Sequence, residues 1–102
     1  MVKIEIYGYV RARESIGVIV TDLPTDSEKS VTLNLYEKLP DGNRIPYDAE
    51  ILDKTIKCAK KLKAIDFSVT VPTYTKNKVI VEAVVDKNGI PLKAEEYLPL
   101  KD

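Results

Sequence analysis

Polar and apolar residues alternate along most of the chain, and this spacing predicts strands. In residues 2–13 the apolar side chains of Val2, Ile4 and Ile6 fall on one face, and charged and tyrosine side chains fall on the other. A period of two is the pattern of a half-buried strand. Gly8 interrupts the inward row, as a bulge or a sharp bend would. The same reasoning predicts further strands in residues 17–21, 30–38, 65–71 and 78–85.

The period changes between Pro46 and Lys63. Apolar residues there recur at spacings of three and four, at Leu52, Ile56, Ala59 and Leu62. This pattern predicts an amphipathic helix. Lysines gather in its later turns, where cations suit the negative end of a helix: Lys54, Lys57, Lys60, Lys61 and Lys63. The predicted order is three strands, one helix, two strands and a tail.

A ten-residue segment recurs in the chain. Residues 41–50 return as residues 86–95, with six of the ten positions identical. Each copy has turn-forming residues followed by Ile-Pro-x-x-Ala-Glu, and Pro at the first helical position with Glu in the first turn is typical of a helix start. The repeat therefore predicts a turn and a helix start in each copy, and the alternative fold is two similar strand-strand-turn-helix motifs packed together. Convergence of two turns on the same residue types is the other explanation.

The tail after the second copy is too apolar for a freely solvated end. We expect residues 90–100 to pack on this domain or on a partner, with a helical turn at residues 93–98. Its apolar residues are Ile90, Leu92, Tyr97, Leu98 and Leu100.

Length and composition describe one soluble domain. The chain has 102 residues, of which 44% are hydrophobic and 31% charged, with 16 basic and 16 acidic residues and no net charge. No apolar run approaches the roughly 18 residues of a membrane span, and the N-terminus lacks the long apolar region of a signal peptide. We expect a cytoplasmic protein, of a cell or of an infected host cell. Abundant Lys, Glu, Ile and Val without Gln, His or Trp lean towards a thermophilic source.

The chain lacks the residues of most catalytic and metal sites. It has one cysteine, Cys58, and no histidine, which excludes an internal disulfide, a zinc site of the Cys/His type and a His-activated nucleophile. Cys58 is expected to be a small buried apolar residue. Asp22, Asp26 and Glu28 share one loop, but acidic loop residues usually face water rather than Mg²⁺. We therefore expect no enzyme, no cofactor and no metal.

The predicted order is also that of an OB-fold, a small five-stranded barrel with a helix between strands 3 and 4. Residues 6–13, Ile-Tyr-Gly-Tyr-Val-Arg-Ala-Arg, and residues 17–23, Gly-Val-Ile-Val-Thr-Asp-Leu, resemble the opening of the anticodon-binding OB domains of class II aminoacyl-tRNA synthetases. Residues 59–62 resemble the helix exit of those domains. The resemblance covers about residues 2–85 and implies a free-standing OB domain, since no catalytic domain follows. Length, composition and the repeat also resemble small duplicated-motif proteins of archaeal filamentous viruses.

The candidate binding surface is an aromatic and basic strand face. Aromatic rings stack bases for about 1–3 kcal/mol each, and arginine neutralises phosphate, although Tyr is also common on solvated strands. We therefore expect a non-enzymatic module that binds single-stranded DNA or RNA. The alternative is a protein-interaction module of unknown role, viral or plasmid-encoded, that is monomeric or a homodimer. The candidate nucleic-acid-binding residues are Tyr7, Tyr9, Arg11, Arg13 and Tyr36.

Overall fold

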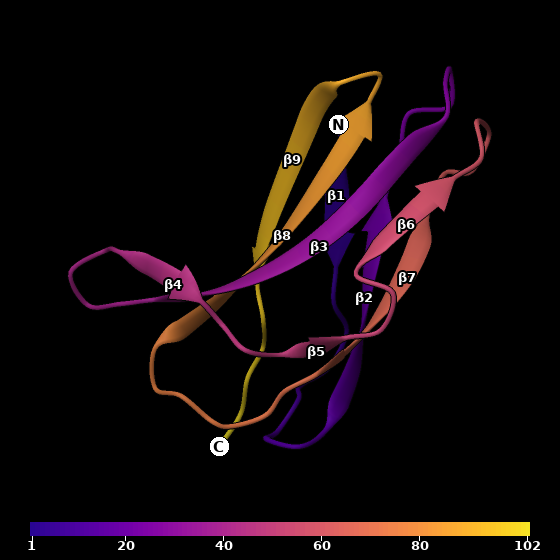
Figure 1. The fold of residues 1–102 in the computed structure, drawn as a ribbon. Coiled ribbons are helices and arrows are strands. Elements are labelled where there is room, and N and C mark those ends of the chain that lie inside the picture. The colour runs from indigo at the N-terminus through magenta and orange to yellow at the C-terminus, as the bar shows by residue number, and fades with distance from the viewer.

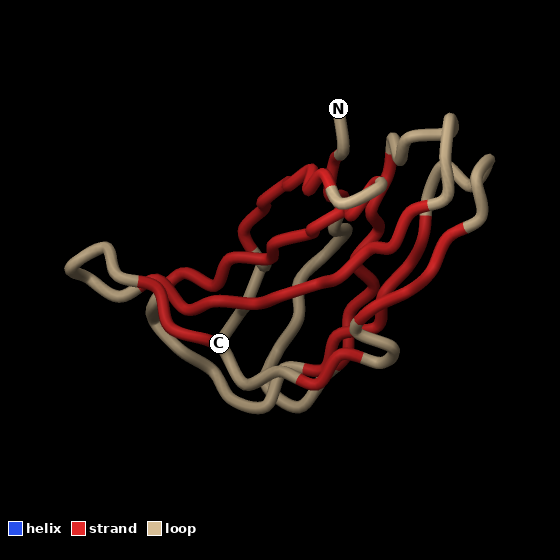
Figure 2. Tube along the Cα trace, turned by 45° about the horizontal axis from the view of Figure 1, so that its top comes forward, coloured by secondary structure: helices blue, strands red, loops and turns tan.

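The computed structural model describes all of residues 1–102 and contains nine strands and no helix (Figure 1). Figure 2 shows that loops and turns alone join the strands. No segment forms a helix that is long and apolar enough to cross a membrane. The strands are β1 (Lys3–Glu5), β2 (Ser15–Thr21), β3 (Lys29–Lys38), β4 (Arg44–Pro46), β5 (Glu50–Ile51), β6 (Thr55–Cys58), β7 (Ile65–Thr70), β8 (Lys78–Lys87) and β9 (Ile90–Tyr97).

The strands form two antiparallel sheets. The first has the order β1-β2-β7-β5, and the second has the order β4-β3-β8-β9, with β6 also paired to β3. β3 holds β8 along one side, and on the other side it holds β4 at one end and β6 at the other. Between β4 and β6 the chain crosses to the first sheet, where β5 pairs with β7.

The core lies between the sheets, because alternate residues of each strand point inward. A single cluster of 19 buried residues fills it. β3 contributes Val31 and Leu33, β8 contributes Val81, and β7 contributes Phe67, of which only 1% is exposed. Branched valine side chains dominate the inward positions and suit a pleated, buried surface.

The strand connectivity is that of an immunoglobulin-like sandwich. If β1, β2, β3, β4, β5, β7, β8 and β9 take the letters A, B, C, C′, D, E, F and G, the two sheets read A-B-E-D and C′-C-F-G. A parallel bridge between Val10 and Leu100 joins the segment after the first strand to the segment after the last. The buried tryptophan and inter-sheet disulfide of antibody domains are absent, because the chain has no Trp and one Cys.

The predicted helix over Pro46–Lys63 is wrong, and so is the OB barrel that required it. This region contains β4, β5 and β6 joined by turns, and Asp53 has a φ of 51°, which a helix does not allow. The supposed apolar stripe does not face a core, since Leu52 is 71% exposed and Leu62 is 41% exposed. In the structure, β6 pairs with β3 and β5 pairs with β7, so this region forms strands despite its helix-like spacing of apolar residues.

The two copies of the repeat occupy similar places, but neither starts a helix. Residues 41–50 form the turn after β3 and the strand β4, and residues 86–95 form the turn after β8 and most of β9. Each copy thus closes a hairpin whose first strand is central in the same sheet. The tail pairs with β8 as a strand rather than forming the expected helical turn, and only its end packs. Leu98 is buried, whereas Ile90, Leu92 and Tyr97 stay exposed. The two-motif alternative with helices is therefore wrong as well, and an internal duplication of this segment stays a prediction.

One lysine is buried where β3 begins. Lys29 is 4% exposed, and its ammonium donates to the carbonyls of Ala59, Lys60 and Leu62 at 2.8, 2.9 and 2.7 Å. An ammonium has three donors and no acceptor, so these carbonyls satisfy it completely. The contact fixes the connection from β6 to β7 against β3.

A pair of alanine substitutions distinguishes this fold from the predicted helix. Phe67→Ala removes a fully buried ring and should lower the free energy of unfolding by about 3–5 kcal/mol. Leu52→Ala removes an exposed side chain and should change it by no more than about 0.5 kcal/mol. Urea unfolding measures both. A core-sized loss for Leu52→Ala would contradict the structure, because only the helix places Leu52 in a core.

Candidate interaction surface

Two candidate tyrosines lie just beyond the end of β1. Gly8 between them has a φ of 83°, as the predicted sharp bend requires. Tyr7 is 69% exposed and Tyr9 is 73% exposed. The bend takes the chain from the first sheet towards Val10, which pairs beside the second sheet. Tyr7 and Tyr9 therefore lie at the side of the sandwich where the chain passes from β1 to the end of β9.

Charged groups already contact these rings. The phenol of Tyr7 donates to Glu5 Oε2 at 2.8 Å, and this hydrogen bond to a carboxylate raises the pKa of Tyr7. The Lys101 ammonium lies 5.3 Å from the centre of the Tyr9 ring. Cations over ring faces are attracted by the π electrons. A cation thus lies near one side of the Tyr9 ring, which stays 73% exposed.

The other three candidate residues do not complete one surface. Arg11 Nε donates to the backbone oxygen of Asp102 at 3.3 Å, which holds its guanidinium against the end of the chain rather than beside the tyrosines. Arg13 is an exposed residue of the turn before β2, with a φ of 68°. Tyr36 lies on β3 in the other sheet and is half-buried. The structure therefore separates Tyr36 from Tyr7 and Tyr9, which the strand pattern had placed on neighbouring strands.

A groove brings Tyr7 and Tyr9 together with a tyrosine that sequence reasoning did not select. It has a volume of about 470 Å³ and lies between β1 with the residues that follow it and the end of β9. Tyr97 lines it from β9, and the Lys78 ammonium lies 4.6 Å from the centre of the Tyr97 ring. We call this the tyrosine groove. It is lined by Ile4, Glu5, Ile6, Tyr7, Gly8, Tyr9, Glu96, Tyr97 and Pro99.

β9 beside the groove is an edge strand with one free side. Its only ladder partner is β8, and no backbone hydrogen bond joins it to β1. The N–H of Leu98 donates to the Val79 carbonyl, so even-numbered residues pair with β8 and odd-numbered residues face away. Pro91 fits this parity, because its missing N–H falls on the free side. The backbone groups of Lys93 and Glu95 therefore have no backbone hydrogen-bond partner on that side, although β1 lies close to β9. We call these groups the edge window.

Neighbouring groups close the free side at both ends of the edge window. At one end the N–H of Tyr97 donates to Glu96 Oε1 at 2.9 Å. Beyond it, the N–H of Val10 donates to the carbonyl of Pro99 at 3.1 Å on the same side of the strand. At the other end Pro91 offers no donor. A partner strand can therefore add here in only a few registers.

The other sheet edges are much shorter than β9. β9 has eight residues, while β1 and β4 have three each, β5 has two and β6 has four. Very short edge strands are one way in which proteins avoid unwanted pairing. β9 is thus the one edge of this fold that is long enough to template another strand.

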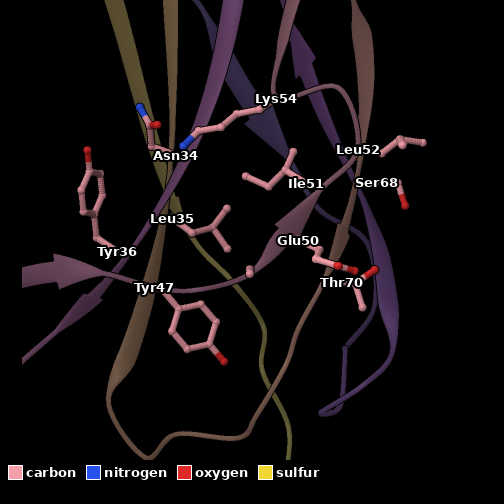
Figure 3. Close-up of a pocket in the computed structure, with 11 residues that line it drawn as sticks. Asn34, Leu35, Tyr36, Tyr47, Glu50, Ile51, Leu52, Lys54, Ser68 and Thr70 are labelled. Atoms are coloured by element: carbon pink, nitrogen blue, oxygen red, sulfur yellow. The ribbon is translucent and has the colours of Figure 1, made fainter.

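The largest pocket lies elsewhere, where the chain crosses between the sheets (Figure 3). It has a volume of about 710 Å³, and Leu35 and Ile51 contribute its apolar lining. In Figure 3 the Lys54 side chain extends towards Asn34 above this lining. The titratable residues that line the pocket are Tyr36, Tyr47, Glu50 and Lys54. No hydrogen bond or ion pair joins any two of these four side chains, and the Tyr47 hydroxyl instead donates to the carbonyl of Thr73.

Acidic residues of the loop after β2 form ion pairs rather than a metal site. No three His, Cys, Asp or Glu side chains gather where they could hold a metal ion. Asp22 instead pairs with Lys3 at 3.7 Å, and Asp26 pairs with Lys87 at 2.6 Å. The hydrogen bond from Lys87 lowers the pKa of Asp26. Two acidic residues of the loop after β2 are thus held in ion pairs, Asp22 with a lysine of β1 and Asp26 with a lysine of β8.

No protein-family model matches this chain, and a search of curated proteins finds no similar sequence. The class of protein is therefore defined by the fold alone, as an immunoglobulin-like sandwich with a free edge strand.

The thiol of Cys58 should be unreactive in the folded protein. Cys58 is 3% exposed, and burial raises its pKa, so little of the nucleophilic thiolate forms near neutral pH. A thiol reagent such as dithionitrobenzoate should react slowly in buffer and rapidly in concentrated urea, and the native rate should keep rising above pH 9. Equal rates in the two solvents would contradict the burial of this side chain.

Proposed function

We propose that this chain is a non-enzymatic protein-interaction module that adds an extended segment of a partner protein to β9. The observation that carries the proposal is the edge window, since the backbone groups of Lys93 and Glu95 have no backbone hydrogen-bond partner on the side away from β8. Strand addition to an exposed sheet edge is a common form of peptide recognition, in which backbone hydrogen bonds give affinity and side-chain pockets give specificity.

The tyrosine groove supplies the side-chain pocket. A strand that pairs with the edge window ends against the tyrosine groove, where a side chain at its end would meet the rings of Tyr7 and Tyr9. Burying one apolar side chain there contributes about 1.5–3 kcal/mol. The four new backbone hydrogen bonds contribute about 0.5–1.5 kcal/mol each. Aromatic residues surrounding a small apolar contact are typical of protein interfaces.

Binding of single-stranded nucleic acid stays a prediction with less support. The carboxylates of Glu5 and Glu96 line the same groove as the tyrosines, and they repel phosphate. The lysines once assigned to a helix lie on β6 and in its neighbouring turns, not on β1 or β9. A chain without net charge needs its cations gathered at the site to bind nucleic acid.

The proposal predicts that a peptide partner depends on the backbone at position 93 and not on its side chain. Peptides selected from a displayed random library should bind the wild type and Lys93→Thr, which keeps the N–H. They should bind Lys93→Pro at least tenfold more weakly, because proline removes a free-side donor without disturbing β8. Calorimetric titration measures the affinities, and amide exchange should show new protection at Lys93 and Glu95.

Titration with oligothymidine and oligouridine at two salt concentrations tests the alternative, which is binding of single-stranded nucleic acid. Nucleic-acid binding that Tyr9→Ala weakens by about 1–3 kcal/mol, in a protein that selects no peptide on β9, would refute the protein-interaction proposal. Selected peptides that bind Lys93→Pro as tightly as wild type would refute the assignment to β9.

A further inference from the structure

We infer that a second copy of this chain is a partner for β9, so that two sandwiches join through their edge windows. This inference rests on the proposed function, because it names an occupant of the same free edge. The two β9 strands would run antiparallel about a two-fold axis, and the sheets would continue as β4-β3-β8-β9 followed by β9-β8-β3-β4. A two-fold interface uses the same patch twice and must therefore be self-complementary.

The free-side parity of β9 restricts the registers. Residues that face outward must lie opposite outward-facing residues of the second copy, since only such pairs exchange both backbone hydrogen bonds. The register that places Ala94 on the two-fold axis sets Lys93 opposite Glu95 of the second copy, and Glu95 opposite Lys93 of the second copy. Both pairs exchange N–H and C=O groups, which uses the whole edge window.

Charge selects this register over its neighbours. Lys93 and Glu95 both project from the outer face of the sheet, because they are aligned with Val84 and Glu82 of β8. Unlike charges directly opposite each other stabilise a strand pair, and like charges destabilise it. Lys93 has no ion-pair partner in its own chain, while Glu95 is paired with Arg44. The dimer would extend this pair into a three-residue network.

The two adjacent registers are less favourable. Centring the axis on Lys93 sets two lysines opposite each other and places Pro91, which has no donor, opposite Glu95. Centring it on Glu95 sets two glutamates opposite each other and brings Pro91 to Pro99, whose carbonyl Val10 already occupies. With the axis on Ala94, Pro91 instead lies opposite Tyr97. The N–H of Tyr97 needs no acceptor from the second copy there, because it already donates to the Glu96 carboxylate.

Cysteine cross-linking tests the register directly. In a Cys58→Ala background, Ala94→Cys should form a disulfide-linked dimer under mild oxidation, because residues on the axis form a non-hydrogen-bonded pair with Cα atoms about 4.5 Å apart, within disulfide range. Lys93→Cys and Glu95→Cys report on the two adjacent registers and should cross-link at least tenfold more slowly. Faster cross-linking of either would overturn the inferred register.

Sedimentation equilibrium of the uncross-linked chain tests the dimer itself. The wild type and Lys93→Arg should show a dimer fraction that rises from micromolar to millimolar concentration. Lys93→Glu sets acids opposite each other twice per dimer, so it should weaken dimerisation about tenfold or more. A monomer at every concentration would overturn the inference. Peptide selection on β9 would still decide the proposed function, so the two failures are distinguishable.

Discussion

The antiparallel pairing of β3 with β8 is the interaction on which the rest of the structure depends. Its register runs from Ser30 opposite Asp86 to Lys38 opposite Lys78, which aligns the longest strands over their full length. The alignment places Val31, Leu33 and Leu35 beside Val85, Ala83 and Val81 on one face, and these six residues belong to the core cluster of 19. A slip of one residue would turn this set out to solvent, so the apolar pattern fixes the register.

This central pair also determines where each edge lies. β8 continues through a two-residue turn into β9, so the last strand of the chain becomes a full-length edge. The other side of β3 is shared by β4 and β6, and the crossing to β5 between them leaves the pocket that Leu35 and Ile51 line. Lys29 at the start of β3 then holds the chain between β6 and β7 through three carbonyls. One edge is consequently long and paired on a single side, whereas the others are short.

That asymmetry leaves β9 as the one long exposed edge of the fold. A long edge strand is a risk for association unless it is blocked, and β9 is blocked only in part. Pro91, the Glu96 carboxylate and Val10 close its ends, while Lys93 and Glu95 keep their backbone groups free. The tyrosine groove at one end adds an apolar site beside this short free segment. An edge that is open over so few residues favours pairing with a specific partner strand over nonspecific association.

Period-two alternation by itself determined β2, β3, β7 and β8 almost to their ends, because their apolar residues must all face one core. The sequence also indicated the bend at Gly8, the burial of Cys58 and the outward positions of Tyr7 and Tyr9. The sequence could not decide residues 46–63 or 93–98, where lysine, glutamate, alanine and leucine favour a helix as readily as a strand. Tertiary structure decided both, since β3, β7 and β8 offered unpaired backbone groups to these segments. It also separated Tyr36 from Tyr7 and brought Tyr97 to the groove, because sheet membership depends on contacts distant in the chain.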